Sequence, residues 1–146
     1  CDKPLQKGIS EVICQGSEIA VLGVGSMVSV CQKVCEELRD HKTARATFVS
    51  VRFVKPVDTC LLDQLSKNHS LLVTVEENVK SGGFGEHVSA YMEACHPEVR
   101  VLPLAIGDHF IEHGTVDSQR VKTGLNVQEI VDAVEQSWAD LVRNKK

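Results

Sequence analysis

A glycine-rich segment at residues 23–28, Gly-Val-Gly-Ser-Met-Val, joins an apolar run to a helical pattern, which is where α/β proteins hold phosphate groups. The dinucleotide-binding fingerprint needs a third glycine where Val28 stands. The next apolar run ends at Arg52 without the acidic residue that binds a ribose hydroxyl. No Gly-Lys-Ser or Gly-Lys-Thr follows to make a P-loop. The segment therefore favours a tight structural turn between a strand and a helix.

Two adjacent carboxylates, Glu76 and Glu77, follow another apolar run and are candidates for acid–base chemistry. Residues at the carboxyl ends of parallel strands line the usual functional crevice of α/β proteins. Successive strand residues point to opposite faces, however, so these two carboxylates cannot easily act on one substrate. We expect them to make fixed polar contacts with a neighbouring loop or domain.

His109 and His113 are four residues apart, a spacing that could bind zinc on a helix. The metalloprotease motif needs Glu directly after the first histidine, where this chain has Phe110. Gly107 and Gly114 bracket the segment, which indicates a loop. The chain also has no Gly-x-Ser-x-Gly elbow for a nucleophilic serine. We therefore expect neither a metal site nor covalent catalysis.

The composition is that of one soluble domain: 146 residues, of which 42% are hydrophobic and 25% charged. The net charge of −4 and the 4% aromatic content argue against nucleic-acid binding. No apolar stretch approaches the ~18 residues of a membrane span. The chain starts at Cys1 and not at Met. We expect residues 1–146 to be one domain from a longer cytoplasmic protein, with no nucleic-acid or membrane partner.

The six cysteines form no Cys-x-x-Cys pair that would indicate zinc. Cys31 and Cys35 fall on the apolar face of an expected helix, where cysteine acts as a small hydrophobe. We expect reduced and largely buried thiols.

Short apolar runs alternate with amphipathic stretches along the chain. Four runs read as strands: residues 19–22, 47–51, 71–75 and 99–102. Four stretches have apolar residues at helical spacing: residues 27–38, 61–65, 84–95 and 127–142. Ser26, Asp58 and Asn126 stand where helix N-caps are expected. A short strand at residues 9–13 is expected at an edge, and residues 104–125 read as a polar loop with one short helix. This alternation predicts an α/β protein, a three-layer sandwich.

Four segments, in order along the chain, together resemble one family. They are residues 23–28, residues 51–58 (VRFVKPVD), residues 73–85 (VTVEENVKSGGFG) and residues 110–114 (FIEHG). The series resembles the C-terminal domain of transketolase-like thiamine diphosphate enzymes. Within that group it is most similar to 1-deoxy-D-xylulose-5-phosphate synthases. The resemblance extends from about Gly8 to Trp138.

The resemblance implies a three-layer α/β/α sandwich around a five-stranded mixed sheet of order 1-3-2-4-5, with strand 1 antiparallel. It also implies a parent transferase that condenses pyruvate with glyceraldehyde 3-phosphate for isoprenoid biosynthesis, using thiamine diphosphate and Mg²⁺. The family's cofactor signature is Gly-Asp-Gly followed later by Asn-Asn, whereas this chain has Gly107-Asp108-His109 and no Asn-Asn. We therefore expect this domain to carry no catalytic residue, to bind no cofactor and to be inactive alone.

The partners implied by the resemblance are the preceding domains of the same enzyme and a second subunit of a homodimer. The family's strand order places Arg52 across Gly23 from Glu76 and Glu77, and we expect an ion pair there. The turn at Gly25 and Ser26 and the loop after Glu77 should form one crevice that receives the neighbouring domain. The residues expected to be structural or interdomain are Gly25, Ser26, Arg52, Lys55, Glu76, Glu77, Gly82, Gly83 and His113.

Two alternatives stay open at this point. One is the C-terminal domain of another transketolase-like enzyme or of a 2-oxo acid dehydrogenase beta subunit. The other is a freestanding regulatory domain that binds an anion or nucleotide at the helix that follows Ser26.

Overall fold

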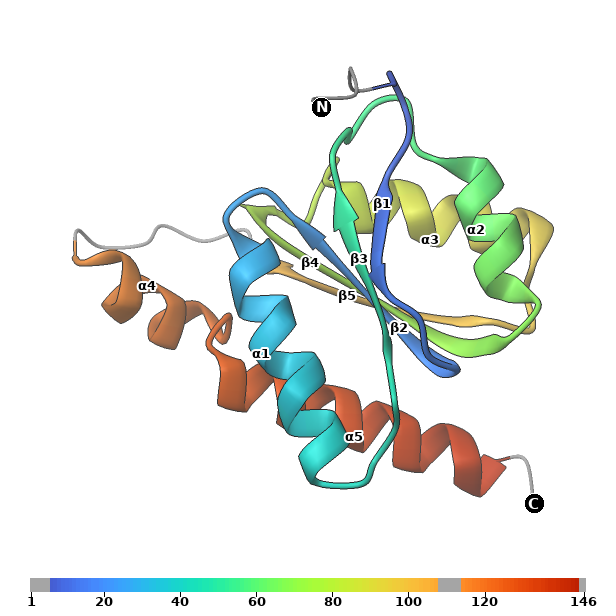
Figure 1. The fold of residues 1–146 in the computed structure, drawn as a ribbon. Helices are drawn as coiled ribbons and strands as arrows, with labels where there is room; N and C mark the ends of the chain where they lie inside the picture. The colour runs from blue at the N-terminus through green and yellow to red at the C-terminus, as the bar shows by residue number, and fades with distance from the viewer. Residues whose placement is uncertain (1–5, 108–113, 145–146) are drawn as a thin grey trace, which may run out of the picture.

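The sheet has five strands in the order β1-β3-β2-β4-β5. The computed structural model describes residues 6–107 and 114–144. The strands are β1 (Glu11–Cys14), β2 (Glu18–Val24), β3 (Thr47–Val51), β4 (His69–Val79) and β5 (Arg100–Ile106). β1 pairs antiparallel with β3, and all other pairs are parallel (Figure 1). The fold class, the strand order and the antiparallel first strand are confirmed.

Helices cover both faces of the sheet (Figure 1). α1 (Met27–Asp40) and α5 (Val127–Asn144) pack on one face, and α2 (Thr59–Ser66) and α3 (Phe84–Cys95) on the other. A fifth helix, α4 (Val116–Thr123), lies outside these layers and has no buried residue. β2 and β4 are neighbours in the interior of the sheet, and their apolar runs at residues 19–22 and 71–75 are buried, as a position covered on both faces requires.

Two strands extend further than the apolar runs predict. β4 continues beyond Val75 to Val79, and β5 continues beyond Leu102 to Ile106. The extension has a physical basis, because the two strands stay paired and Val79 lies opposite Ile106 after a register shift. Glu76 and Glu77 therefore lie within the strand and not after it.

Two of the three predicted caps are confirmed. Asp58 accepts a hydrogen bond from the Leu61 amide at 3.0 Å, and Asn126 accepts one from the Glu129 amide at 3.0 Å. Ser26 precedes α1, but its side chain makes no capping bond. Its backbone is already helical, with φ −62° and ψ −21°, and its hydroxyl turns instead to Glu77.

The five described cysteines are free, but their expected burial is wrong for three of them. Cys31 is buried and Cys35 half-buried, as their apolar helix face predicts. Cys14 is exposed on the edge strand, and Cys60 and Cys95 are exposed in the terminal turns of α2 and α3. Within residues 6–107 and 114–144, no helix is long and apolar enough to cross a membrane.

Candidate functional site

The candidate site lies at the carboxyl ends of β2 and β4, where the chain turns from each strand into the next segment. After β2 the turn passes through Gly25, whose φ of +56° lies in the left-handed region that favours glycine. A Cβ on Gly25 would meet no atom within 4 Å, so the backbone conformation alone explains this glycine. The turn leaves Ser26 exposed beside the end of β4.

Glu76 is fully buried and binds the first turn of α3. Its two carboxylate oxygens accept hydrogen bonds from the amides of Phe84 at 3.0 Å and Gly85 at 2.8 Å. A Cβ on Gly83 would lie 2.7 Å from the Glu76 carboxylate, so glycine is needed for this close approach. Glu76 thus acts as an internal anion at a helix N-terminus, where the helix dipole favours negative charge.

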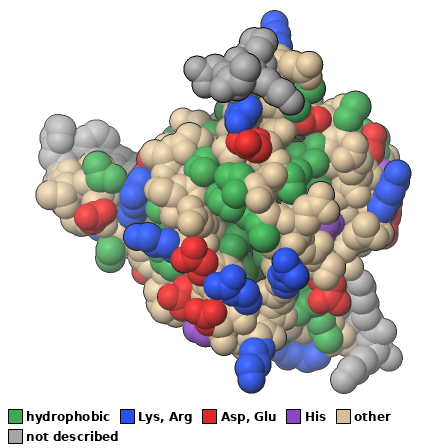
Figure 2. All heavy atoms as spheres, in the orientation of Figure 1, with side chains coloured by type: hydrophobic (Ala, Val, Ile, Leu, Met, Phe, Trp, Pro, Cys, Tyr) green, Lys and Arg blue, Asp and Glu red, His purple; other side chains and the backbone are tan. Residues whose placement is uncertain are grey.

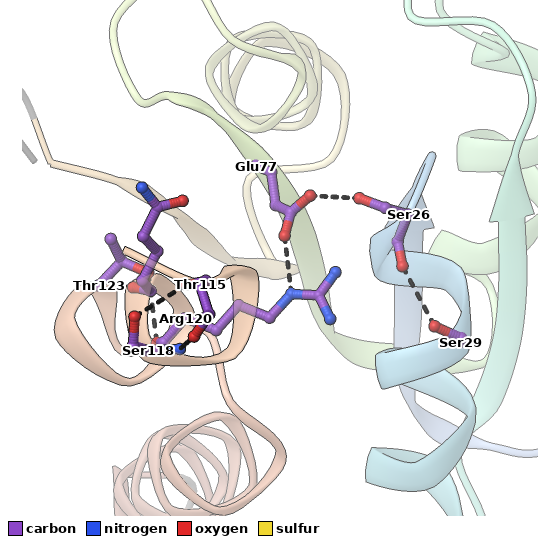
Figure 3. Close-up of polar contacts among 8 residues, drawn as sticks. Ser26, Ser29, Glu77, Thr115, Ser118, Arg120 and Thr123 are labelled. Carbon is purple, nitrogen blue, oxygen red and sulfur yellow. Dashed lines mark hydrogen bonds and ion pairs between the residues drawn. The ribbon is translucent and has the colours of Figure 1, made fainter. Parts of the chain in front are cut away.

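Glu77 points away from Glu76, as the alternation of side chains along a strand requires, and joins two other elements (Figure 3). The Ser26 hydroxyl donates to one of its carboxylate oxygens, and Arg120 Nε of α4 donates to the other at 2.7 Å. Partial burial raises the pKa of Glu77, but the bonds from Ser26 and Arg120 outweigh burial and leave that pKa lowered. Glu77 therefore stays ionised as the centre of a polar latch between β4, α1 and α4.

A pocket of about 240 Å³ lies between α4 and the end of the sheet. Glu77 and Arg120 line it together with Ile106, Val116, Gln119, Thr123 and Leu125. Its volume is below the roughly 300 Å³ at which pockets for organic ligands usually begin. Its only described charged groups are already paired with each other.

The expected ion pair between Arg52 and Glu76 or Glu77 is wrong. Arg52 donates instead to Glu11 of β1, and the pair is largely exposed. The physical reason is the shorter distance. Glu11 lies on the adjacent strand β1 opposite Ser50, and Ser50 comes two residues before Arg52, so Glu11 is on the same face as Arg52. A contact with β4 would have to cross β2, a distance of roughly 10 Å.

The other expected residues lie in different places. Lys55 is exposed in the loop between β3 and α2, outside the segments that form the site. Gly82 has a φ of +72°, and its amide donates to the Glu86 carboxylate. His113 lies outside the described residues, as does His109.

Sequence reasoning missed Arg120, which is the basic partner of Glu77. Arg120 belongs to α4, a short helix with no apolar stripe, in a segment that was expected to be mainly loop. The sequence offered one signal for Arg120, namely a basic residue in a short helix without an apolar face. That signal does not identify its partner Glu77, which is 43 residues away in the sequence.

The donor groups at this site do not fit thiamine diphosphate or Mg²⁺. Within the described ranges, no three His, Cys, Asp or Glu side chains are placed to hold a metal ion. The carboxylates of Glu76 and Glu77 are committed to backbone amides and to Ser26 and Arg120. We assign no chemical step through either group to this chain.

Comparison with known proteins gives consistent matches over most of the chain. A family model described as "Transketolase, C-terminal domain" matches residues 8–130. A 1-deoxy-D-xylulose-5-phosphate synthase of Pseudoalteromonas translucida is 39% identical over 130 residues, which are 89% of this chain and 20% of that enzyme. The same enzyme of Lachnoclostridium phytofermentans is 42% identical over 134 residues, 90% of this chain and 21% of that enzyme. The chain thus spans about one fifth of the length of these relatives.

Solved structures agree on the fold. A structure titled "Split gene transketolase, inactive beta4 tetramer" superposes with a TM-score of 0.84 at 24% identity, covering 94% of this chain and 44% of that one. Transketolase from Campylobacter jejuni superposes with a TM-score of 0.64 at 16% identity, covering 88% of this chain and 18% of that one.

Proposed function

Since the chain belongs to the transketolase C-terminal domain family, we propose that it is the C-terminal assembly domain of a 1-deoxy-D-xylulose-5-phosphate synthase. The observation that carries the proposal is the identity of 39–42% to enzymes of that name over about nine tenths of the chain. The parent enzyme is a cytoplasmic transferase that condenses pyruvate with glyceraldehyde 3-phosphate. Residues 1–146 are one domain of it.

In the parent enzyme, thiamine diphosphate with Mg²⁺ supplies the carbanion chemistry, and the preceding domains hold both. This chain contributes structure and contacts and no catalytic group, so it is inactive when isolated. Its partners are those preceding domains and a second subunit of a homodimer. The commitment of Glu76 and Glu77 to contacts within the chain supports this division of labour.

The surface proposed to receive the preceding domains surrounds the latch of Ser26, Glu77 and Arg120. Three of the exposed large apolar side chains belong to the segments around this latch. They are Val79 (49% exposed), Val116 (58%) and Val121 (59%). Exposed apolar groups around a polar pair are typical of an interaction surface. The alternative of an anion site next to Ser26 is disfavoured, because the Glu77 carboxylate already takes the Ser26 hydroxyl.

The proposal can be tested with a chimaera. This chain replaces the matching C-terminal fifth of the relative that is 42% identical, and the same enzyme without that fifth is the control. We expect the chimaera to form a dimer and to produce 1-deoxyxylulose 5-phosphate, and the truncated enzyme to do neither. A folded chimaera as inactive as the truncated enzyme would contradict the proposal.

A second variant tests the surface itself. Val116→Asp with Val121→Asp should leave the melting temperature of the isolated chain within about 2 °C, because both side chains are exposed. In the chimaera the same pair should weaken assembly at least tenfold. Val142→Asp, on an exposed side chain at the end of α5, is the matched control and should leave assembly unchanged.

A further inference from the structure

A second feature lies on the other side of α1, where a groove of about 410 Å³ separates this helix from the edge of the sheet. Cys14 of β1 and Cys35 of α1 both line it, and Ala46 and Phe48 form its apolar base. Figure 2 views this side of the molecule and shows apolar side chains gathered near the centre of the face. The groove brings together two cysteines that are distant in sequence.

The strand pairing explains why both cysteines line this groove. Cys14 lies opposite Phe48 in the β1–β3 ladder, and Phe48 belongs to the core cluster against which Cys35 packs. The ladder shifts register between Val12 and Cys14, so the strand is irregular just before Cys14. β1 has four residues and, among the residues that the structure describes, pairs with β3 alone, so Cys14 lies on a short edge strand.

The two sulfur atoms also interact electrostatically. The pKa of the Cys35 thiol is raised to about 12. Burial is the main cause, and negative charge on Cys14 and on Glu36 contributes the rest. Cys14 therefore lies near enough to Cys35 for charge on one sulfur to act on the other.

We propose that Cys14 and Cys35 are a peroxide-oxidised pair that forms a disulfide between β1 and α1. The exposed Cys14 first loses its proton to solvent, and its sulfur attacks a hydroperoxide. The O–O bond breaks, Cys14 becomes a sulfenic acid, and the alkoxide or hydroxide that leaves takes one proton from solvent to become alcohol or water. The Cys35 sulfur then attacks the Cys14 sulfur. The S–S bond forms, the S–O bond breaks, and the departing hydroxide takes the Cys35 proton as water. Two thiols lose two electrons, which reduce one peroxide.

The other described cysteines do not share this arrangement. Cys31 is fully buried in the same layer, and burial raises its pKa far above the usual range, which makes it a poor nucleophile. Cys60 and Cys95 are exposed, but they lie on α2 and α3, on the opposite face of the sheet. They therefore serve as internal controls for oxidation that depends on solvent exposure alone.

The test uses the reduced chain treated with hydrogen peroxide at low micromolar protein concentration, followed by peptide mapping without reductant. Cleavage after Lys, Arg and Glu places Cys14, Cys31 and Cys35 on three separate peptides, residues 12–18, 19–33 and 34–36. We expect a disulfide between residues 12–18 and 34–36 in most molecules, and a melting temperature that rises on oxidation. Cys60→Ser should retain both results, and Cys14→Ser and Cys35→Ser should each lose both.

The proposal falls if Cys14 is oxidised to sulfinic acid without a cross-link, or if the cross-link joins two chains or involves Cys31. Because the isolated chain is used, the result does not depend on whether the parent enzyme is a synthase.

Discussion

At the scale of single residues, Glu76 is the side chain whose loss should cost most at this end of the sheet. It is fully buried and accepts hydrogen bonds from two backbone amides of α3. Glu76→Gln keeps the shape but points an NH₂ group at one of those amides, which leaves a buried donor unpaired. We expect the free energy of unfolding to fall by about 1–3 kcal/mol, measured by urea denaturation.

The control is Glu93→Gln, a change of the same kind at an exposed residue of α3, the helix whose amides donate to Glu76. Its effect should be within about 0.5 kcal/mol of zero. Equal effects of the two variants would show that the buried carboxylate contributes nothing beyond an ordinary surface charge.

A second residue, His69, should make stability depend on pH. Its Nδ1 donates a hydrogen bond to the Leu65 carbonyl at 2.8 Å. Its Nε2 therefore carries no proton and accepts a hydrogen bond from the Thr47 hydroxyl at 2.7 Å. Burial lowers the pKa of His69 from its ordinary value of 6.5, and the bond to Leu65 offsets this only in part. The unfolded chain therefore binds the proton more readily than the folded one. As pH falls below about 6.5, His69 lowers the stability of the fold, and this loss continues until the pH reaches the lowered pKa of the folded state.

The measurement compares urea midpoints between pH 8 and pH 5 for the native chain and for His69→Asn, which has no titrating group. The native chain should lose more stability than the variant over the acidic half of this range. NMR titration of the His69 ring gives an independent readout if the variant folds poorly. A ring pKa at or above 6.5 contradicts the prediction.

At the scale of elements, α4 is held by few contacts. None of its residues is buried, and Arg120 pairs with Glu77 at 2.7 Å. Arg120→Met keeps the aliphatic stem and removes the ion pair. We expect the α4 amides to exchange hydrogen about tenfold faster, while the α1 and α5 amides keep their protection. Arg39→Met, which removes an exposed pair with Asp40, should leave α4 exchange unchanged.

The elements that sequence reasoning predicted well are those fixed by local physics. The apolar runs of β2 and β4 and the Asp58 and Asn126 caps depend on neighbouring residues, so their pattern is visible in the sequence. The contacts of Ser26 and Arg52 depend on which strand or helix end comes within reach. The Ser26 hydroxyl donates to Glu77 and does not cap its own helix, and Arg52 donates to Glu11, the nearer carboxylate, on β1.

At the scale of the whole molecule, the strand order was available from family resemblance and not from periodicity. Alternating strands and helices predict a three-layer sandwich but leave the position of β1 open. The resemblance supplied the order β1-β3-β2-β4-β5, which the sheet has. It could not supply the latch at Glu77, because the partner of Glu77 comes from α4, outside the segments that carried the resemblance.

The whole chain offers no free site for the diphosphate group of thiamine diphosphate among its described helix N-termini at α1 and α3. Of the helices that follow the strands, α1 and α3 each begin next to a carboxylate of this chain: Glu77 beside Ser26 at α1 and Glu76 at α3. A diphosphate placed there would meet negative charge in place of free amide donors. We therefore expect titration calorimetry with thiamine diphosphate and Mg²⁺ to detect no binding to the isolated chain. The chimaera with the preceding domains of the relative should bind the cofactor in the same buffer. Micromolar affinity for the isolated chain would show that this domain contributes to the cofactor site, and the purely assembling role proposed for it would then be wrong.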